Sequence, residues 1–315
     1  MIPKRLDTMS ENKMVYFLMI LAAFIWGGTF NAAGFALNGF HPLSVAFIRF
    51  ALATVVLLIA GHREIFGTPV TGRDWPNFIL LGLTGIFAYN VFFMYAMKYT
   101  SPVNGSLITA INPVVTTLLA TFLLKERFTA RLAGGVLISF LGVGLVISGG
   151  SWQVIRTLEF NYGDILALLS VFSWSFYSIT IKRTSSRFSP MVTTFYGFFT
   201  GTVLLLPFGL ICKPGPAAFF SAGAPAVTAI LYLSLIGSVL AFFWWNRGVS
   251  ILGAARSAVF VNLIPVATII ISLLFRETIT LFQVAGSALV IGAVALAGVR
   301  EPAPRPEANS VVARS

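Results

Sequence analysis

The stretch at residues 106–149 occurs a second time at 257–300, 151 positions further along the chain. The pairs that match at this spacing are Ser106 with Ser257, Thr117 with Thr268, Leu123 with Leu274, Glu126 with Glu277, Thr129 with Thr280 and Gly135 with Gly286. Each copy consists of two apolar runs joined by a short charged turn, which is too apolar for a soluble repeat array. The sequence therefore predicts a duplicated membrane domain.

Composition supports a membrane protein. Of the 315 residues, 57% are hydrophobic and 10% are charged, and the mean hydropathy is +0.90. Such a chain has too few polar residues to cover a soluble globule. The net charge of +11 comes from basic residues that stand singly or in threes between apolar runs, so we expect a lipid bilayer and not nucleic acid as the partner.

Ten apolar runs have about the 20 residues that a membrane helix needs. They are 14–35, 43–61, 76–97, 103–124, 132–149, 162–181, 190–211, 226–246, 254–275 and 281–299. The predicted fold is therefore an all-α integral membrane protein with ten transmembrane helices, arranged as five-helix repeats at 14–149 and 162–299. A tail at 1–13, a connecting loop at 150–161 and a proline-rich, disordered tail at 300–315 complete the chain.

The basic residues orient the helices. With the N-terminus inside, the tails and inner loops carry 16 Lys and Arg, against four on the other side: Lys98, Arg156, Lys213 and Arg276. The positive-inside rule then predicts two cytoplasmic termini in a plasma membrane, the inner membrane if the source is bacterial. Because each repeat has an odd number of spans, the second must enter the membrane upside down, as in transporters built from inverted repeats.

Several short motifs resemble a known family. Each fourth helix closes with Glu and a following Thr, in LLKERFT at 123–129 and LLFRETIT at 273–280, and the first two helices contain WGGTF at 26–30 and IRF at 48–50. Over about 14–299 the chain resembles the ten-helix EamA-type branch of the drug/metabolite transporter superfamily. The resemblance implies a transporter that exports or exchanges metabolites, and it leaves the substrate open.

Arg49 lies about six residues into the second span, roughly 9 Å deep at 1.5 Å per residue. An arginine at that depth is costly unless it faces water, a ligand or a partner. It could bind a substrate carboxylate or act at a gate. Alternatively, it snorkels to the interface or caps helix carbonyls.

Trp26 and Trp174 are 148 residues apart, at matching places in the first helix of each half. Both are predicted near the midplane, where an interfacial anchor is not expected. They could line a central cavity and stack against an aromatic or apolar solute, or simply pack between helices.

Further polar side chains are candidates for substrate binding because polarity inside a span is costly. These candidates are Tyr89, Asn90 and Tyr95 in the third span, Asn112 in the fourth, Tyr177 in the sixth and Asn262 in the ninth. For Asn112 and Asn262 we favour a structural role, since each lies near a proline that frees a backbone carbonyl.

Pro113 and Pro265 are candidate hinges that let half a helix move. Glu126 and Glu277 end their helices, where a carboxylate opposes the helix dipole and requires a basic or N–H partner. We expect Thr129 and Thr280 to cap the following helices. The two glutamates are interpreted as structural, with a possible role in gating.

Several functions are disfavoured by what the sequence lacks. No span has Asp or Glu near its middle, which disfavours a proton relay and organic cations as main substrates. One cysteine, Cys212, and two histidines exclude an internal disulfide and a multi-histidine metal site, so no metal or cofactor is expected. No catalytic set or phosphate loop is present, so the protein is not expected to be an enzyme.

The function predicted from these observations is a secondary transporter that exports or exchanges small metabolites by alternating access. Aromatic or neutral amino acids are the favoured substrates, with nucleosides or drug-like compounds as the alternative and a channel or membrane scaffold less favoured. Apart from the small-molecule substrate and the bilayer, we expect at most a weak dimer.

Overall fold

The computed structural model describes residues 3–99, 108–109, 111–126, 129–148, 150–156, 162–274 and 281–298. All regular structure in these ranges is helical, which confirms the predicted all-α class. The first half contains α1 (Pro3–Leu37), α2 (Pro42–Gly67), a third helix made of α3 (Trp75–Leu81), η1 (Gly82–Ala88) and α4 (Tyr89–Tyr99), then α6 (Asn112–Leu124) and α7 (Ala130–Ser148). A short helix, α8 (Trp152–Arg156), follows.

The second half repeats this order. It contains α9 (Tyr162–Thr184), α10 (Pro190–Ile211), the short η2 (Pro216–Phe220), an eighth helix made of α11 (Ala224–Leu231), η3 (Tyr232–Leu240) and α12 (Ala241–Leu252), a ninth made of α13 (Ala254–Ala258), η4 (Val259–Asn262) and α14 (Leu263–Leu274), and α15 (Leu281–Gly298).

Six continuous helices are long and apolar enough to cross a membrane: Lys13–Leu37, Pro42–Gly67, Trp75–Tyr99, Tyr162–Thr184, Pro190–Ile211 and Ala224–Leu252. The other four predicted spans contain shorter apolar helices within the described residues: Asn112–Leu124, Ala130–Gly142, Ala254–Ala267 and Val284–Ala293.

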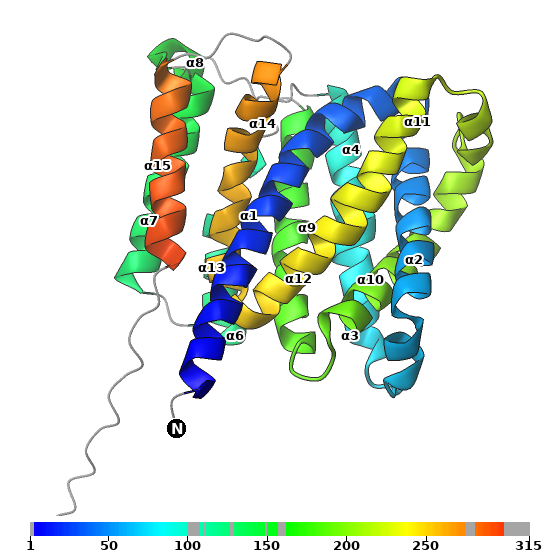
Figure 1. Cartoon of the computed structure of the whole chain (residues 1–315). Coiled ribbons are helices and arrows are strands. Elements are labelled where there is room, and N and C mark those ends of the chain that lie inside the picture. The colour runs from blue at the N-terminus through cyan, green and yellow to red at the C-terminus, as the bar shows by residue number, and fades with distance from the viewer. Residues whose placement is uncertain are drawn as a thin grey trace, which may run out of the picture.

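The two halves run in opposite directions. In Figure 1, α1 rises from the N-terminus at the bottom of the view, whereas α9, its counterpart, descends from the end that carries α8. The packing follows the same relation, since α1 contacts α14 and α12 while α9 contacts the counterparts of these helices, α6 and α4. In two further contacts a helix packs on its own repeat counterpart, α2 on α10 and α7 on α15. Such contacts lie where a two-fold axis between the halves would pass.

Local sequence signals fix the corresponding helix starts. α2 and α10 both begin with a proline, whose missing N–H costs nothing in the first turn. The preceding residues, His41 and Ser189, are both extended, and their side chains accept hydrogen bonds from Leu43 N and Val192 N. Two proline starts separated by 148 residues in sequence therefore correspond to two equivalent helix N-termini.

The third and eighth helices each contain a π-helical segment, η1 and η3. A π-helix has i→i+5 hydrogen bonds in place of the i→i+4 bonds of an α-helix, and such segments are frequent at functional sites. η1 packs on α10 and α9, and η3 packs on α2 and α1. The two halves therefore present an irregular segment to each other at the same level of the bundle.

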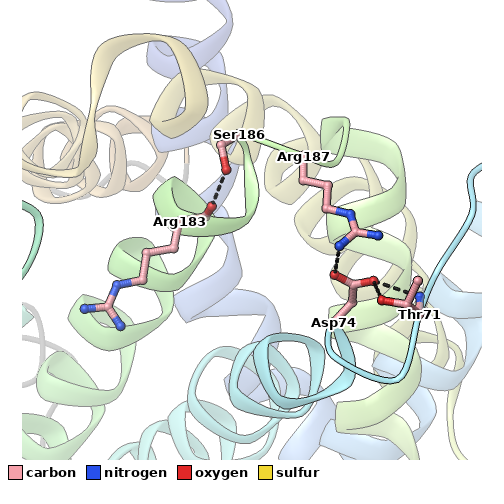
Figure 2. Close-up of polar contacts among 5 residues, drawn as sticks. All are labelled: Thr71, Asp74, Arg183, Ser186 and Arg187. Atoms are coloured by element: carbon pink, nitrogen blue, oxygen red, sulfur yellow. Dashed lines mark hydrogen bonds and ion pairs between the residues drawn. The ribbon is translucent and has the colours of Figure 1, made fainter.

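At the end that carries the N-terminus, an ion pair joins the loop before α3 to the loop before α10. Arg187 lies 2.8 Å from the carboxylate of Asp74, which also accepts hydrogen bonds from the backbone N–H and the hydroxyl of Thr71. Figure 2 shows Arg187 reaching across to Asp74, while the Arg183 side chain points away from this cluster. At the other end, His41 N donates to Pro214 O at 3.0 Å. This bond joins the loop before α2 to the loop after α10, which are the repeat counterparts of the loops before α10 and α3.

Candidate functional site

A central cavity of about 30 Å³ lies between the two halves. Helices of both halves line it. The lining residues are Trp26, Thr29 and Phe30 of α1, Arg49 of α2, Tyr89 and Phe93 of α4, Thr109, Asn112 of α6, Ser170, Val171 and Trp174 of α9, Phe242 of α12, Val261 of η4 and Ile264 of α14. A volume of this size has room for one or two waters, so the surrounding helices must separate before a small molecule can enter. Five of the nine sequence-predicted binding residues line it: Trp26, Arg49, Tyr89, Asn112 and Trp174.

The cavity is displaced toward the end of the bundle opposite the N-terminus. α1 and α4 run toward that end, and they contribute Phe30 and Phe93 one turn beyond Trp26 and Tyr89. α9 runs away from it and contributes Ser170 one turn before Trp174. The level of Trp26 and Trp174 is therefore the floor of the cavity.

Arg49 is 3% exposed, and the neutral groups around it hold its guanidinium in place. Its Nε donates to Ser238 Oγ at 2.6 Å, and its two terminal nitrogens donate to Asn90 Oδ1 at 3.3 Å and Gly237 O at 3.4 Å. The guanidinium also lies 5.9 Å from the ring centre of Phe242. None of the described carboxylates is within ion-pair distance of it, so its charge is hydrogen-bonded but not neutralised.

The π-helical segments supply the acceptors for this arginine. Ser238, in η3, donates to Leu233 O five residues earlier, and Asn90, just after η1, donates to Gly85 O and Ile86 O. The oxygens of Ser238 and Asn90 are thus turned toward Arg49. Gly237 O, also in η3, accepts from Trp26 Nε1 at 3.0 Å as well. Snorkelling to the interface is therefore not the arrangement that the structure has.

Aromatic rings form the floor of the cavity. Trp26 contacts Trp174 edge to face at 5.2 Å, and Trp245 lies 5.2 Å from Trp26 and 5.6 Å from Trp174. Phe242 and Tyr89 complete the cluster, at 5.3 Å and 5.0 Å from Trp174. Such ring contacts are worth about 0.5–1.5 kcal/mol each beyond their buried area. The two tryptophans are packed against each other and still border the cavity.

Hydroxyl groups extend from Asn112 along the contact between α6 and α9. Thr116 donates to Asn112 Oδ1 at 3.2 Å and lies 2.8 Å from Ser175 Oγ, which donates to Val171 O. The Asn112 side chain therefore accepts from the next turn of its own helix and takes part in an interhelical contact. The predicted pairing of Asn112 with a carbonyl freed by Pro113 stays a prediction.

The remaining predicted binding residues lie elsewhere. Asn90 is fully buried behind Arg49. Tyr95 stacks on Tyr99 near the far end of α4. Tyr177 packs against Gly85 and donates to Asn246 Oδ1 at 3.1 Å.

Asn262 is buried in the ninth helix. It donates to Ser139 Oγ on α7 at 2.6 Å. These four side chains contact protein groups and not the cavity.

Glu126 caps a helix from the other half. Its carboxylate accepts from Ala254 N at 2.9 Å and Ala255 N at 3.1 Å, at the start of α13. The N–H partners expected for this carboxylate are therefore present, and the expected cap by Thr129 is confirmed by its bond from Leu132 N. Glu277 and Thr280 lie outside the described residues.

The two prolines lie in first turns. Pro113 is at the start of α6, and Pro265 is in the first turn of α14, which follows the 3₁₀ segment η4. In the described residues the ninth span changes its path before Pro265, at η4, so the proline marks where the regular helix begins.

Sequence reasoning missed Phe242, Trp245, Ser238 and Asn246. Asn246 was the available signal, because it is a polar residue within the eighth span and pairs with Tyr177 and Thr194. Phe242 and Trp245 belong to an apolar aromatic run and carried no signal of their own.

Comparison with known proteins agrees with this architecture. The EamA-like transporter family matches the chain twice, at residues 13–148 and 161–299, once for each half. The chain belongs to the EamA-like transporter family. It is therefore a multi-pass membrane transporter, and the expectation that it is not an enzyme is consistent with its relatives.

Named relatives cover nearly the whole chain. An uncharacterized transporter of Bacillus subtilis, YyaM, is 35% identical over 287 residues, which are 90% of this chain and 94% of that protein. A probable terminal-alkyne amino-acid exporter of Streptantibioticus cattleyicolor is 27% identical over 291 residues, 92% and 93% of the two chains. A crystal structure with 20% identity covers 91% of this chain and 96% of its own, with a TM-score of 0.70, and shows the same fold.

Proposed function

We propose that this EamA-like transporter exports or exchanges small amino acids with aromatic or other neutral side chains. The observation that carries the proposal is Arg49, a buried cation with no carboxylate partner among the described residues, at the wall of an aromatic cavity. Ser238, Asn90 and Gly237 use three of the five N–H donors of its guanidinium. The other two can bind a substrate carboxylate, while the rings of Trp26, Trp174 and Phe242 contact its side chain.

The chemistry of the cavity supports this substrate class over organic cations. Among the described residues, its lining contains one cation, no carboxylate, and several neutral polar groups. A cationic solute would be repelled by Arg49 in a medium of low dielectric constant, where unpaired charge is costly. The relative named as a probable amino-acid exporter supports the same class.

For the mechanism, we propose alternating access between two inverted halves, with both termini in the cytoplasm as the distribution of Lys and Arg indicates. The cavity then lies toward the outside. The cytoplasmic side is closed by the aromatic floor and by the contact of Glu126 with α13, and Pro113 and Pro265 lie where the fourth and ninth helices could bend.

Counterflow in proteoliposomes tests the function. Vesicles loaded with an unlabelled amino acid are diluted into labelled phenylalanine, and we expect saturable uptake that is absent from protein-free vesicles. Phenethylamine, which lacks the carboxylate, should compete far less well than phenylalanine. Exchange of nucleosides or lipophilic cations without any amino acid would overturn the proposal, and a flux without trans-stimulation would indicate a channel.

A further inference from the structure

At the aromatic floor and on its N-terminal side, several buried polar atoms of the described residues have no hydrogen-bond partner. Among them are Trp174 Nε1 and Ser178 Oγ on α9, Trp245 Nε1 on α12 and Ser257 Oγ on α13. All four side chains are at most 5% exposed. Buried indole N–H groups usually find an acceptor, as Trp26 Nε1 does with Gly237 O.

These atoms come from helices that pack on one another. α9 contacts α12 and α13, and α12 contacts α13. Ser178 is one turn beyond Trp174 on the same face of α9, in the direction of the N-terminal end. The rings of Trp174 and Trp245 are 5.6 Å apart. The unpaired groups therefore belong to three helices that pack on one another, and on α9 they run from the floor at Trp174 toward the N-terminal end.

Other buried polar groups of these helices are paired, although Thr117 Oγ1 on α6 and Thr193 Oγ1 on α10 also lack a partner. Tyr177 donates to Asn246, Asn246 donates to Thr194, and Ser175 donates to Val171 O. The three-helix contact is closed further down by Glu126 on the start of α13 and by Lys182, whose Nζ donates to Ser250 O at 2.7 Å. We call the unpaired groups of Trp174, Ser178, Trp245 and Ser257 the polar seam. On its N-terminal side the helices are held together by the hydrogen bonds of Glu126 and Lys182.

We propose that this seam, formed by Trp174, Ser178, Trp245 and Ser257, is the cytoplasmic half of the solute passage. When α13 separates from α9 and α12, the four groups become hydrated and contact the polar end of the moving solute. Burying these groups without partners costs free energy, which favours the open form. The hydrogen bonds of Glu126 to α13 and of Lys182 to Ser250 O favour the closed form. The inference rests on the proposed transport function, and it adds the path by which a solute passes between the cavity and the cytoplasm.

Cysteine accessibility tests the passage. Cys212 is the only cysteine of the chain, so Cys212→Ser gives a background without thiols. Ser178→Cys and Ser257→Cys are introduced singly, with Thr180→Cys as the matched control, because Thr180 is on α9, is 2% exposed and donates to Phe176 O. A membrane-impermeant thiosulfonate is then added to the cytoplasmic face of oriented vesicles.

We expect the cysteines at 178 and 257 to react at least about tenfold faster than the cysteine at 180, since the open form is a minor but populated state. Adding Glu126→Gln should accelerate both reactions and leave the control unchanged. Equal rates at the three positions would overturn the passage. Counterflow is measured in the same vesicles. Amino-acid exchange without selective labelling would refute only the proposed passage. Selective labelling without amino-acid exchange would refute only the proposed substrate class.

A second pair of variants keeps the proposal testable if the cysteine variants are unstable. Ser178→Ala removes an unpaired hydroxyl and should leave the melting temperature unchanged or raised while it slows transport. Ser175→Ala removes a paired hydroxyl and should lower the melting temperature. A Ser178→Ala variant with wild-type transport would contradict a role in the passage.

Discussion

Trp26 and Arg49 donate to the same acceptor, the carbonyl oxygen of Gly237, at 3.0 and 3.4 Å. This one atom of η3 ties together the first, second and eighth helices at the level of the cavity floor. A backbone carbonyl oxygen has two lone pairs and can accept both bonds. The residue predicted to contact a carboxylate and the residue predicted to stack on an aromatic solute are thus positioned by a common backbone group.

Arg49→Lys should lower transport nearly as much as Arg49→Gln. A lysine cannot donate to Ser238, Asn90 and Gly237 at once, since an ammonium lacks the planar fork of a guanidinium. With charge-assisted bonds worth about 1.5–3 kcal/mol each, the loss of one or two should reduce the counterflow rate more than tenfold. Arg63→Gln, an exposed arginine on the same helix, is the control and should transport normally. A folded Arg49→Gln variant with the wild-type rate would assign the arginine a purely structural role.

Trp26→Phe and Trp174→Phe should differ in stability although the two tryptophans are related by the repeat. Both substitutions lose packing of the larger indole ring, so both should destabilise the protein. The first also removes the hydrogen bond to Gly237 and should cost about 1 kcal/mol more than the second, whose N–H has no partner among the described residues. Both replace an indole with a phenyl ring, so each is the control for the other. Thermal unfolding in detergent measures the difference. Equal decreases in the melting temperature would show that ring packing alone sets the stability here.

The fold was predictable because its signals are long and repeated. Ten apolar runs, the echo at 151 residues and the odd number of spans per half require few assumptions once lipid is the solvent. Trp26, Trp174 and Arg49 were recognisable because their positions in a span conflict with ordinary membrane placement. Their contacts were not predictable, since both Trp26 and Arg49 donate to Gly237 in η3, and no residue pattern at 232–240 indicates a π-helix.

Tyr177 and Tyr89 illustrate the limit for individual side chains. Both are tyrosines within a span, yet Tyr89 lines the cavity and Tyr177 donates to Asn246 behind the floor. The difference comes from the rotation of each helix about its axis, which the packing of Tyr177 against Gly85 fixes. Hydropathy in a buried helix carries little information on that rotation.

Gly253→Ala should destabilise the contact between Glu126 and α13. Gly253 has φ 91°, and a Cβ there would lie 2.9 Å from Glu126 Oε1. The left-handed backbone alone costs about 1–3 kcal/mol for other residues. Glu126→Ala in the same background removes the clash but not the backbone cost, so the double variant should be less destabilised than the sum of the singles. Additive decreases in the melting temperature would contradict the contact. Gly223→Ala is the control, because a Cβ there would meet Pro225 Cδ at 3.7 Å, an ordinary van der Waals distance.

The ion pair of Asp74 and Arg187 predicts a stability that depends on pH. Hydrogen bonds from Thr71 and, less strongly, the charge of Arg187 lower the pKa of Asp74 below its ordinary value of 3.8. A carboxylate whose pKa is lower in the folded state stabilises the protein above its unfolded pKa, and this contribution is lost as the pH falls through the lowered value.

The melting temperature of the wild type should therefore exceed that of Asp74→Asn by a constant amount above about pH 5, and the difference should shrink below pH 3.8. Because Thr71 contributes most, Thr71→Val should remove more of the difference than Arg187→Gln. High salt should weaken the part due to Arg187, which is half-exposed, and leave the part due to Thr71. If the gap between wild type and Asp74→Asn persists unchanged to about pH 2, the stabilising group is not the Asp74 carboxylate, because it would be protonated in both states.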